Sequence, residues 1–274
     1  MNLPYIAARV VRKLTPRFIQ KFLLQRSILI RAGMDTSDPE SSVKRYKSHL
    51  AEYNVGIEGK TIIVFGFGGT YAVAANLLSF GAKHVALLDL HENLQTKMNL
   101  EVAKQFPEYF FIEKGRAIPQ NRFISVHHGD IMSKTSDMPN VDITVSNSVM
   151  EHVDNLDGII ESLTFFTNPG GVHLHFIHIG DHFGKHPFEM LTYSSFIWRN
   201  FLNPPSNLNR LRMNDHVKSY SKIFKEVKTG VILRDVLEFK EEKHRIREEF
   251  LSDSDEDDSI IVFSLFASGM KNIP

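Results

Sequence analysis

Residues 60–90, KTIIVFGFGGTYAVAANLLSFGAKHVALLDL, decide the fold of this chain. They predict an apolar strand, a glycine turn, a helix and a second apolar strand that ends at Asp89. This is the opening βαβ unit of a nucleotide-binding α/β fold. Gly66 and Gly68 allow the backbone to turn tightly and to approach a ligand closely. Asp89 lies where a carboxylate can bind the hydroxyl groups of a ribose. The alternative is an ordinary strand-to-helix turn that binds no ligand.

Three later segments continue the alternation of strands and helices. Residues 121–131 and 141–146 each predict a strand, and residues 172–178 predict another after a helix at 156–166. The carboxyl ends of parallel strands meet at one edge of a sheet, and open α/β sheets bind their ligands there. We therefore expect the polar residues at these strand ends to line one crevice.

The order of these segments, together with the sequence VMEHV at Val149–Val153, resembles the class I S-adenosylmethionine-dependent methyltransferases. It is most similar to the branch that methylates small molecules, and the resemblance covers residues 60–178. It implies a Rossmann-like α/β fold with N-terminal helices and a seven-stranded, mostly parallel sheet whose last strand is antiparallel. Residues 227–236 and 259–268 alternate as the two closing strands of such a sheet would.

The resemblance also implies a set of contacts to S-adenosylmethionine, the methyl donor. Asp89 would bind the ribose hydroxyls, and Asp130 with the backbone of Ile131 would meet the adenine amino group. Ser146 and Asn147, at the end of the fourth strand, would line the sulfonium side. The contacts to the amino-acid portion of the donor would come from Gly66, Phe67 and Gly68. Each acidic residue has a simpler alternative role as a cap or turn residue.

Glu151 and His152 follow the fourth predicted strand. In quinone-type O-methyltransferases, which this segment resembles, the Glu-His pair follows another glutamate and helps to hold a divalent metal. Ser148 stands at the position of that glutamate, so no metal is predicted. His152, and His178 at the end of the fifth strand, are the predicted catalytic residues, because a neutral imidazole accepts a proton near pH 7. For His152 the alternative is simple packing at a helix start.

The acceptor is expected to bind beyond the fifth strand, in an insertion at residues 180–215. Asp181 and His182 lie at the carboxyl end of that strand, where they can contact a substrate. Arg210 and Arg212 have two interpretations, either binding of an anionic acceptor group or formation of surface salt bridges.

Composition limits the remaining classes of function. The chain has 274 residues with 42% hydrophobic content, enough for one α/β domain. Its formal net charge is +0, which gives no case for nucleic acid as a partner. It contains no cysteine, which excludes disulfides, thiolate metal sites and cysteine nucleophiles and fits a reducing, cytoplasmic location. We expect neither a cleavable leader nor a membrane-spanning segment.

The N-terminus is strongly basic. Its first 33 residues include no acidic residue and seven basic ones, Arg9, Arg12, Lys13, Arg17, Lys21, Arg26 and Arg31. Thr15, Pro16 and Gly33 predict a helix at 16–32. Such a helix can bind an anionic membrane surface peripherally. The alternative, which we favour, is packing of its apolar face on the catalytic domain or on the second subunit of a homodimer. We therefore assign residues 1–58 to an N-terminal helical extension and 59–274 to a methyltransferase domain.

The leading functional hypothesis is methyl transfer from S-adenosylmethionine to a small-molecule acceptor, through a hydroxyl group. A catalytically degenerate donor-binding or scaffold protein is the second hypothesis. It is motivated by Val64, where the family usually has an acidic residue, and by Thr70, near the position of the third motif glycine. An NAD-dependent oxidoreductase is the third, because the glycine turn and Asp89 alone would allow it.

Overall fold

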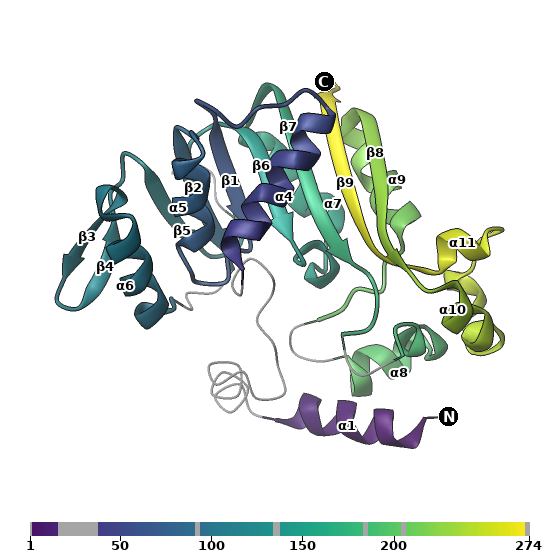
Figure 1. Ribbon diagram of the computed structural model, residues 1–274. Helices are drawn as coiled ribbons and strands as arrows, with labels where there is room; N and C mark the ends of the chain where they lie inside the picture. Colours follow the sequence, from purple (N-terminus) through teal and green to yellow (C-terminus); the bar gives the residue numbers. More distant parts are fainter. Residues whose placement is uncertain are drawn as a thin grey trace.

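The computed structural model describes residues 2–15, 38–90, 94–133, 138–182, 186–203 and 207–271. Its centre is a seven-stranded sheet in the order β5-β2-β1-β6-β7-β9-β8 (Figure 1). The strands are β1 Thr61–Phe65, β2 His84–Asp89, β5 Ile124–His128, β6 Val141–Asn147, β7 Thr167–His178, β8 Phe224–Arg234 and β9 Ile260–Met270. Only β9 runs antiparallel to its two neighbours, β7 and β8. The predicted sheet with an antiparallel last strand is confirmed.

The central strand β1 is mostly apolar because both of its faces are covered. Ile62, Ile63 and Val64 are fully buried, because a parallel strand in the middle of a sheet is covered on both faces. Ile63 lies opposite Ala86 of β2 and Thr144 of β6, which fixes the register of the three strands. The carboxyl ends of β1, β2 and β6 therefore lie at the same edge of the sheet.

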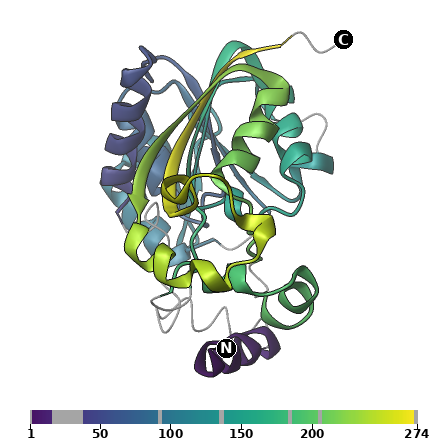
Figure 2. The same cartoon turned by 90° about the vertical axis from the view of Figure 1, so that its right-hand side faces the viewer.

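Helices cover both faces of the sheet (Figures 1 and 2). One face carries α4 Pro39–Glu52, α5 Ala72–Ser79 and α6 Thr96–Gln105, and the other carries α7 Leu156–Phe165 and α9 Met213–Ile223. Tyr46 and Leu50 of α4 are buried in the same apolar core as β1. In the part of the chain that the structure describes, every helix is too short or too polar to cross a bilayer.

A small hairpin projects beside α6 and was not predicted from the sequence. Its strands are β3 Phe110–Glu113 and β4 Arg116–Pro119, and the turn η1 Pro107–Tyr109 leads into it. Lys114 and Gly115, between the two strands, both have positive φ, the backbone conformation of the tightest hairpin turns. Phe110 attaches the hairpin to the domain through its ring contact with Tyr71.

A third apolar cluster lies beyond the carboxyl-end edge of the sheet (Figure 1). It is built around Phe188, Trp198 and Phe239. Its residues include members of α1 Leu3–Leu14, α10 Val236–Glu242 and the short helical segments η4 Glu189–Thr192, η5 Trp198–Leu202 and η7 Glu248–Phe250. The segments α8 Ser195–Ile197 and η6 Lys243–Arg245 precede η5 and η7 in the sequence. The short helix α11 Asp255–Asp258 lies next to α10. The helix predicted at 16–32 lies outside the described residues, whereas α1, which precedes it, was not predicted.

Candidate functional site

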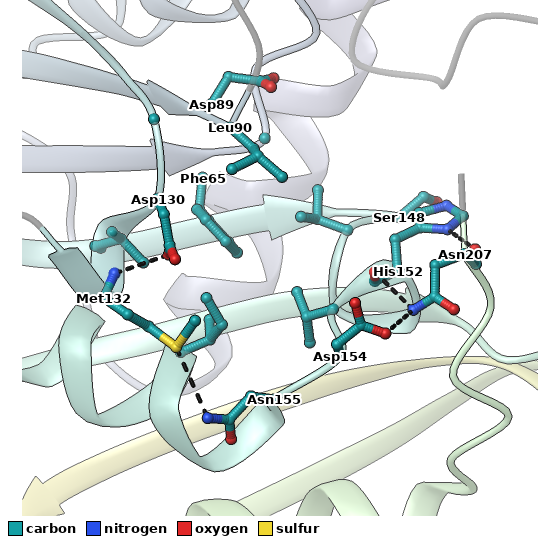
Figure 3. A pocket seen from close by; sticks show the side chains of 16 residues that line it. Phe65, Asp89, Leu90, Asp130, Met132, Ser148, His152, Asp154, Asn155 and Asn207 are labelled. Atoms are coloured by element: carbon teal, nitrogen blue, oxygen red, sulfur yellow. Dashed lines mark hydrogen bonds between the residues drawn. The ribbon is translucent and has the colours of Figure 1, made fainter. Parts of the chain in front are cut away.

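A cavity of about 560 Å³ opens at the carboxyl-end edge of the sheet (Figure 3). It lies where β1, β2, β5 and β6 end, and it includes the turns η2 Ile131–Ser133 and η3 Met150–His152. Its walls combine apolar side chains with carboxyl, amide and imidazole groups. The lining residues are Phe65, Gly66, Asp89, Leu90, Gly129, Asp130, Ile131, Met132, Ser148, Val149, His152, Val153, Asp154, Asn155, Ile159 and Asn207. A crevice of this kind at strand ends is the usual ligand site of an open α/β sheet.

The glycine turn after β1 is packed against the loop that follows β6. Gly66 has φ +77°, and a Cβ added there would lie 2.3 Å from Cγ2 of Val149. No residue other than glycine fits this position without a shift of the chain. The N–H of Gly68 donates to Oδ2 of Asp89 at 3.1 Å. The turn therefore faces the end of β2, as the βαβ interpretation requires.

Two of the predicted acidic residues line the cavity. Asp89 ends β2 and Asp130 follows β5, and the N–H of Gly129 donates to the carbonyl of Asp89 at 3.0 Å. Oδ1 of Asp130 accepts a hydrogen bond from the N–H of Met132 at 3.0 Å, which holds that carboxylate at the start of η2. Ile131, also predicted, forms part of the wall between them and is nearly fully buried.

Other predicted donor contacts lie elsewhere. Ser146 is fully buried, and its Oγ is 2.7 Å from Nδ1 of His175, within the sheet. Phe67 is buried in the core on the α5 face, and Asn147 is not among the cavity-lining residues. Side chains alternate along a strand, so Ser146 turns away from the crevice, and the wall is formed instead by Ser148 and Val149 just after β6.

His152 lines the cavity, and a hydrogen bond determines which nitrogen of its ring carries the proton. Its Nδ1 is 2.7 Å from the backbone carbonyl of Asn207. A carbonyl can only accept, so in the neutral ring the proton is on Nδ1 and Nε2 is the basic nitrogen. The amide of Asn207 in turn donates to the His152 carbonyl and to Oδ1 of Asp154, each at 3.0 Å (Figure 3).

A second asparagine holds the same segment. The N–H of Asn209 donates to the Glu151 carbonyl at 2.9 Å, and its side-chain amide donates to the carbonyls of Met150 and Val153 at 2.8 and 3.1 Å. Neither Asn207 nor Asn209 was predicted as a site residue. The sequence feature that could have indicated them is two asparagines in one loop, because asparagine tolerates positive φ and bonds to nearby backbone. Asn207 has φ 51°.

Glu151 lies directly behind His152 and is fully buried. Burial raises the pKa of its carboxyl from 4.5 to about 8, although nearby backbone groups of Glu151 and His178 and the Ser148 hydroxyl act in the opposite direction. Oε1 of Glu151 is 3.7 Å from Nε2 of His182. Burial, then His178 and His152, lower the pKa of His182 to about 3. Near pH 7, Glu151 is therefore mainly protonated and His182 is neutral.

Three histidine rings follow one another at this end of the cavity. The ring centroids of His152 and His182 are 5.2 Å apart, and those of His182 and His178 are 4.4 Å apart. Burial, followed by the neighbouring His152, lowers the pKa of His178. Of the two histidines predicted as catalytic, His152 lines the cavity, while His178 lies behind His182 at the end of β7.

Comparison with protein-family models gives no match, and no curated protein matches this chain in sequence. Solved structures do match. Phosphoethanolamine N-methyltransferase 2 of Haemonchus contortus, in complex with phosphomonomethylethanolamine and S-adenosylhomocysteine, superposes with a TM-score of 0.52 at 14% identity, over 97% of this chain and 61% of that one. A geranyl diphosphate methyltransferase in complex with S-adenosylmethionine gives 0.51 at 12% identity, over 84% of both chains. The fold is that of the class I S-adenosylmethionine-dependent methyltransferases.

In this methyltransferase fold, the cavity has a polar wall of Asp89 and Asp130 at one end and the histidine rings at the other. Glu151, His152 and His182 each offer one ligand atom, and these atoms lie within 4.8 Å of one another. One carboxylate and two imidazoles are a ligand set that divalent transition metals accept. That no metal binds here stays a prediction from the sequence.

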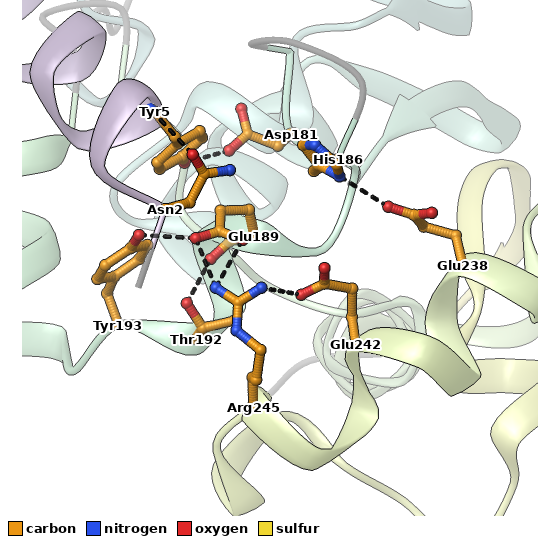
Figure 4. Close-up of polar contacts among 10 residues, drawn as sticks. All are labelled: Asn2, Tyr5, Asp181, His186, Glu189, Thr192, Tyr193, Glu238, Glu242 and Arg245. Carbon is orange, nitrogen blue, oxygen red and sulfur yellow. Dashed lines mark hydrogen bonds and ion pairs between the residues drawn. The ribbon is translucent and has the colours of Figure 1, made fainter.

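The first helix, α1, contacts the rest of the chain next to the histidine end of the cavity. Tyr5 and Arg9 of α1 both bond the carboxylate of Asp181, which follows β7 (Figure 4 shows the Tyr5 contact). The Arg9 guanidinium also lies 5.1 Å from the ring of Trp198, and the ring of Tyr5 stacks on that of Tyr193 at 5.9 Å. Asp181 was expected to contact the acceptor, but its carboxylate is committed to α1.

The two arginines of the 180–215 segment have a structural role. Arg210 donates to the carbonyls of Met190 and Tyr193 at 3.2 and 2.7 Å. Arg212 is buried and donates to carbonyls on either side of it, including that of Ile260 at 2.9 Å. Hydrogen bonds to backbone carbonyls, rather than the expected surface salt bridges, hold both side chains. Their guanidinium groups satisfy backbone carbonyls where the chain crosses the end of the sheet, since five donors in a planar group suit that task.

Proposed function

We propose that this chain is an S-adenosylmethionine-dependent methyltransferase that transfers a methyl group to a hydroxyl of a small-molecule acceptor. The observation that carries the proposal is the cavity itself. It joins Asp89 and Asp130, on the two strand ends where the resemblance leads us to expect the donor, with His152, whose Nε2 is the basic nitrogen of the ring. The proposed donor contacts and the proposed general base therefore line one cavity.

The residues divide into two groups by task. Asp89 would accept hydrogen bonds from the ribose hydroxyls, and Asp130 with the Ile131 backbone would orient the adenine. Bound S-adenosylmethionine supplies an electrophilic methyl group. His152 would take the proton from the acceptor hydroxyl at Nε2 while the oxygen attacks the methyl carbon, the carbon–sulfur bond breaks and S-adenosylhomocysteine leaves. The carbonyl of Asn207 would stabilise the imidazolium through Nδ1–H. The side chains of Leu90 and Val149 form an apolar part of the cavity wall.

Calorimetry with S-adenosylmethionine, S-adenosylhomocysteine and NAD tests the donor half of this proposal. We expect both adenosyl compounds to bind at a single site and NAD to give no heat. Binding of NAD with no binding of the adenosyl compounds would refute the proposal. A screen of hydroxylated small molecules with labelled S-adenosylmethionine then tests transfer itself.

A donor-binding protein without transfer activity is the second candidate. Val64, at the position where the resemblance leads us to expect an acidic residue, is fully buried in the apolar core. The amino group of the donor would therefore lack that carboxylate. Tight binding of S-adenosylhomocysteine, with no methyl transfer to any acceptor, would favour this candidate.

A further inference from the structure

The helix α1 differs from an ordinary surface helix, because part of its apolar surface faces outward. Its buried residues are Tyr5 and Arg9, which face the domain. Ile6 and Val10 pack against the third apolar cluster, but Leu3, Val11 and Leu14 form an outward apolar stripe and are 63%, 66% and 76% exposed. Surface helices normally bury their apolar face, because burial of apolar side chains is what stabilises them. An outward apolar stripe on a helix whose inward face is already satisfied needs a partner outside the domain.

A second apolar element lies next to this stripe. Phe196 and Phe201, in α8 and η5, are 69% and 54% exposed, and their rings are 6.1 Å apart. The two elements are in direct contact, because Nζ of Lys13 donates to the carbonyl of Arg199 at 2.6 Å. Both lie at the lower end of the molecule in Figure 1, beyond the carboxyl ends of the parallel strands. We call α1 and residues 195–202 together the lower apolar face.

The charge of this face selects its partner. Residues 3–14 and 195–202 contain no acidic residue. Arg9 is buried against Asp181, which leaves Arg12, Lys13 and Arg199 as the basic side chains of this face. A two-fold dimer would place the face against itself, and its basic rim would meet an identical basic rim. An anionic bilayer instead attracts the basic side chains and accepts the apolar ones at the boundary between headgroups and acyl chains.

We propose that the lower apolar face binds the surface of an anionic lipid bilayer, with α1 lying in the plane of the interface. The inference is independent of methyl transfer, because it rests on exposure, charge and the contact between two surface elements. It also places the histidine end of the cavity at the membrane side of the molecule, because Tyr5 and Arg9 on the inner side of α1 bond Asp181 next to His182.

Co-sedimentation of the full chain with lipid vesicles tests the proposal. We expect binding to vesicles that contain phosphatidylglycerol, weaker binding at high salt, and little binding to pure phosphatidylcholine. The double variant Val11→Asp/Leu14→Asp should lower the affinity for the anionic vesicles at least about tenfold, because two apolar anchors are lost and two charges of the wrong sign are gained. Both positions are exposed, so the fold should persist, and a thermal melt checks this.

The matched control is Phe111→Asp/Ile112→Asp on the β3–β4 hairpin, whose side chains are 61% and 55% exposed. It adds the same charge at an equally exposed apolar site and should leave vesicle binding unchanged. Absence of wild-type binding to anionic vesicles, or equal loss in both double variants, would overturn the proposal. So would sedimentation velocity showing a dimer that Val11→Asp/Leu14→Asp dissociates, because the face would then belong to a second copy.

Discussion

At the scale of single residues, Asp89 is the sharpest test of donor binding. Its carboxylate lines the cavity and accepts a hydrogen bond from the N–H of Gly68, in the glycine turn where we propose that the donor binds. We expect Asp89→Ala to weaken S-adenosylhomocysteine binding by about 2 kcal/mol, the scale of hydrogen bonds to a charged group. Calorimetry measures it. Glu113→Ala, on the exposed hairpin, removes the same charge far from the cavity and should change nothing. Unchanged affinity of Asp89→Ala with an intact fold would remove Asp89 from the site.

His152 is the corresponding test of catalysis. With a hydroxylated acceptor in hand, His152→Ala should lower turnover by roughly 10²–10⁴-fold and leave donor affinity nearly unchanged, because a general base acts only on the reacting proton. The pH–rate profile should also lose its rise through the histidine range. His178→Ala is the matched comparison and should cost less, since His178 does not line the cavity. Equal turnover in the wild type and in both variants would show that the protein only positions its substrates.

Glu151 makes the stability of the protein depend on pH. Its pKa of about 8 when folded exceeds its ordinary 4.5, so the unfolded chain binds fewer protons and stability falls as pH rises through that interval. Below about pH 6.5, the buried histidines with lowered pKa make stability rise with pH, because the unfolded chain then binds protons that the folded chain does not. Between about pH 6.5 and 8, the free energy of unfolding of the wild type should therefore fall by up to about 2 kcal/mol more than that of Glu151→Gln. Urea denaturation at the two pH values measures it, and parallel declines would contradict the assignment.

At the scale of elements, the loop at 207–209 organises the segment after β6. Asn207 combines φ 51° with a side chain that bonds His152 and Asp154. Asn207→Gly keeps the backbone conformation accessible but removes these two hydrogen bonds and the one that Oδ1 of Asn207 accepts from the Asn203 amide at 2.6 Å. We therefore expect lower turnover with little change in donor affinity. Steady-state kinetics and calorimetry separate the two effects. Asn54→Gly, at an exposed positive-φ turn after α4, is the matched control and should keep full turnover. A similar loss in both variants would mean that the effect is a general one of glycine.

The elements also show what the sequence could predict. The β1–α5–β2 unit, the strands β5 to β7 and the closing pair β8 and β9 follow from local periodicity and glycine placement, which act over a few residues. The inward turn of Ser146 and the contact of Asn207 with His152 do not follow, because each depends on a partner at least 29 residues away. Donor-site residues on strand ends were accessible to pattern reasoning, whereas the loop asparagines and the cluster around Glu151 required the three-dimensional structure.

At the scale of the whole molecule, one ion pair joins the N-terminal helix to the domain. Arg9 and Asp181 have side chains 1% and 0% exposed. Breaking a buried pair typically costs about 3 kcal/mol or more, because one charge is left uncompensated. Arg9→Met should therefore release α1 and speed hydrogen exchange at residues 3–14 at least about a hundredfold, with a smaller effect on the sheet.

Two further variants make that test specific. Arg9→Met/Asp181→Asn removes both charges and should recover part of the protection of α1. Lys222→Met breaks an ion pair with Asp157 whose side chains are about half exposed, and it should leave exchange in α1 unchanged. Exchange in Arg9→Met at the wild-type rate would show that α1 is held by its apolar contacts alone.

The bonds from α1 to Asp181 also have a thermodynamic consequence. Asp181 is next in sequence to His182, whose ring contacts His152 in the cavity. If a partner of α1 favours one arrangement of the histidine end, it will change the affinity of the cavity for its ligands. Such coupling is reciprocal, so a ligand in the cavity must change the affinity of α1 for its partner by the same factor. Occupancy of the cavity and attachment of the first helix would then report on each other.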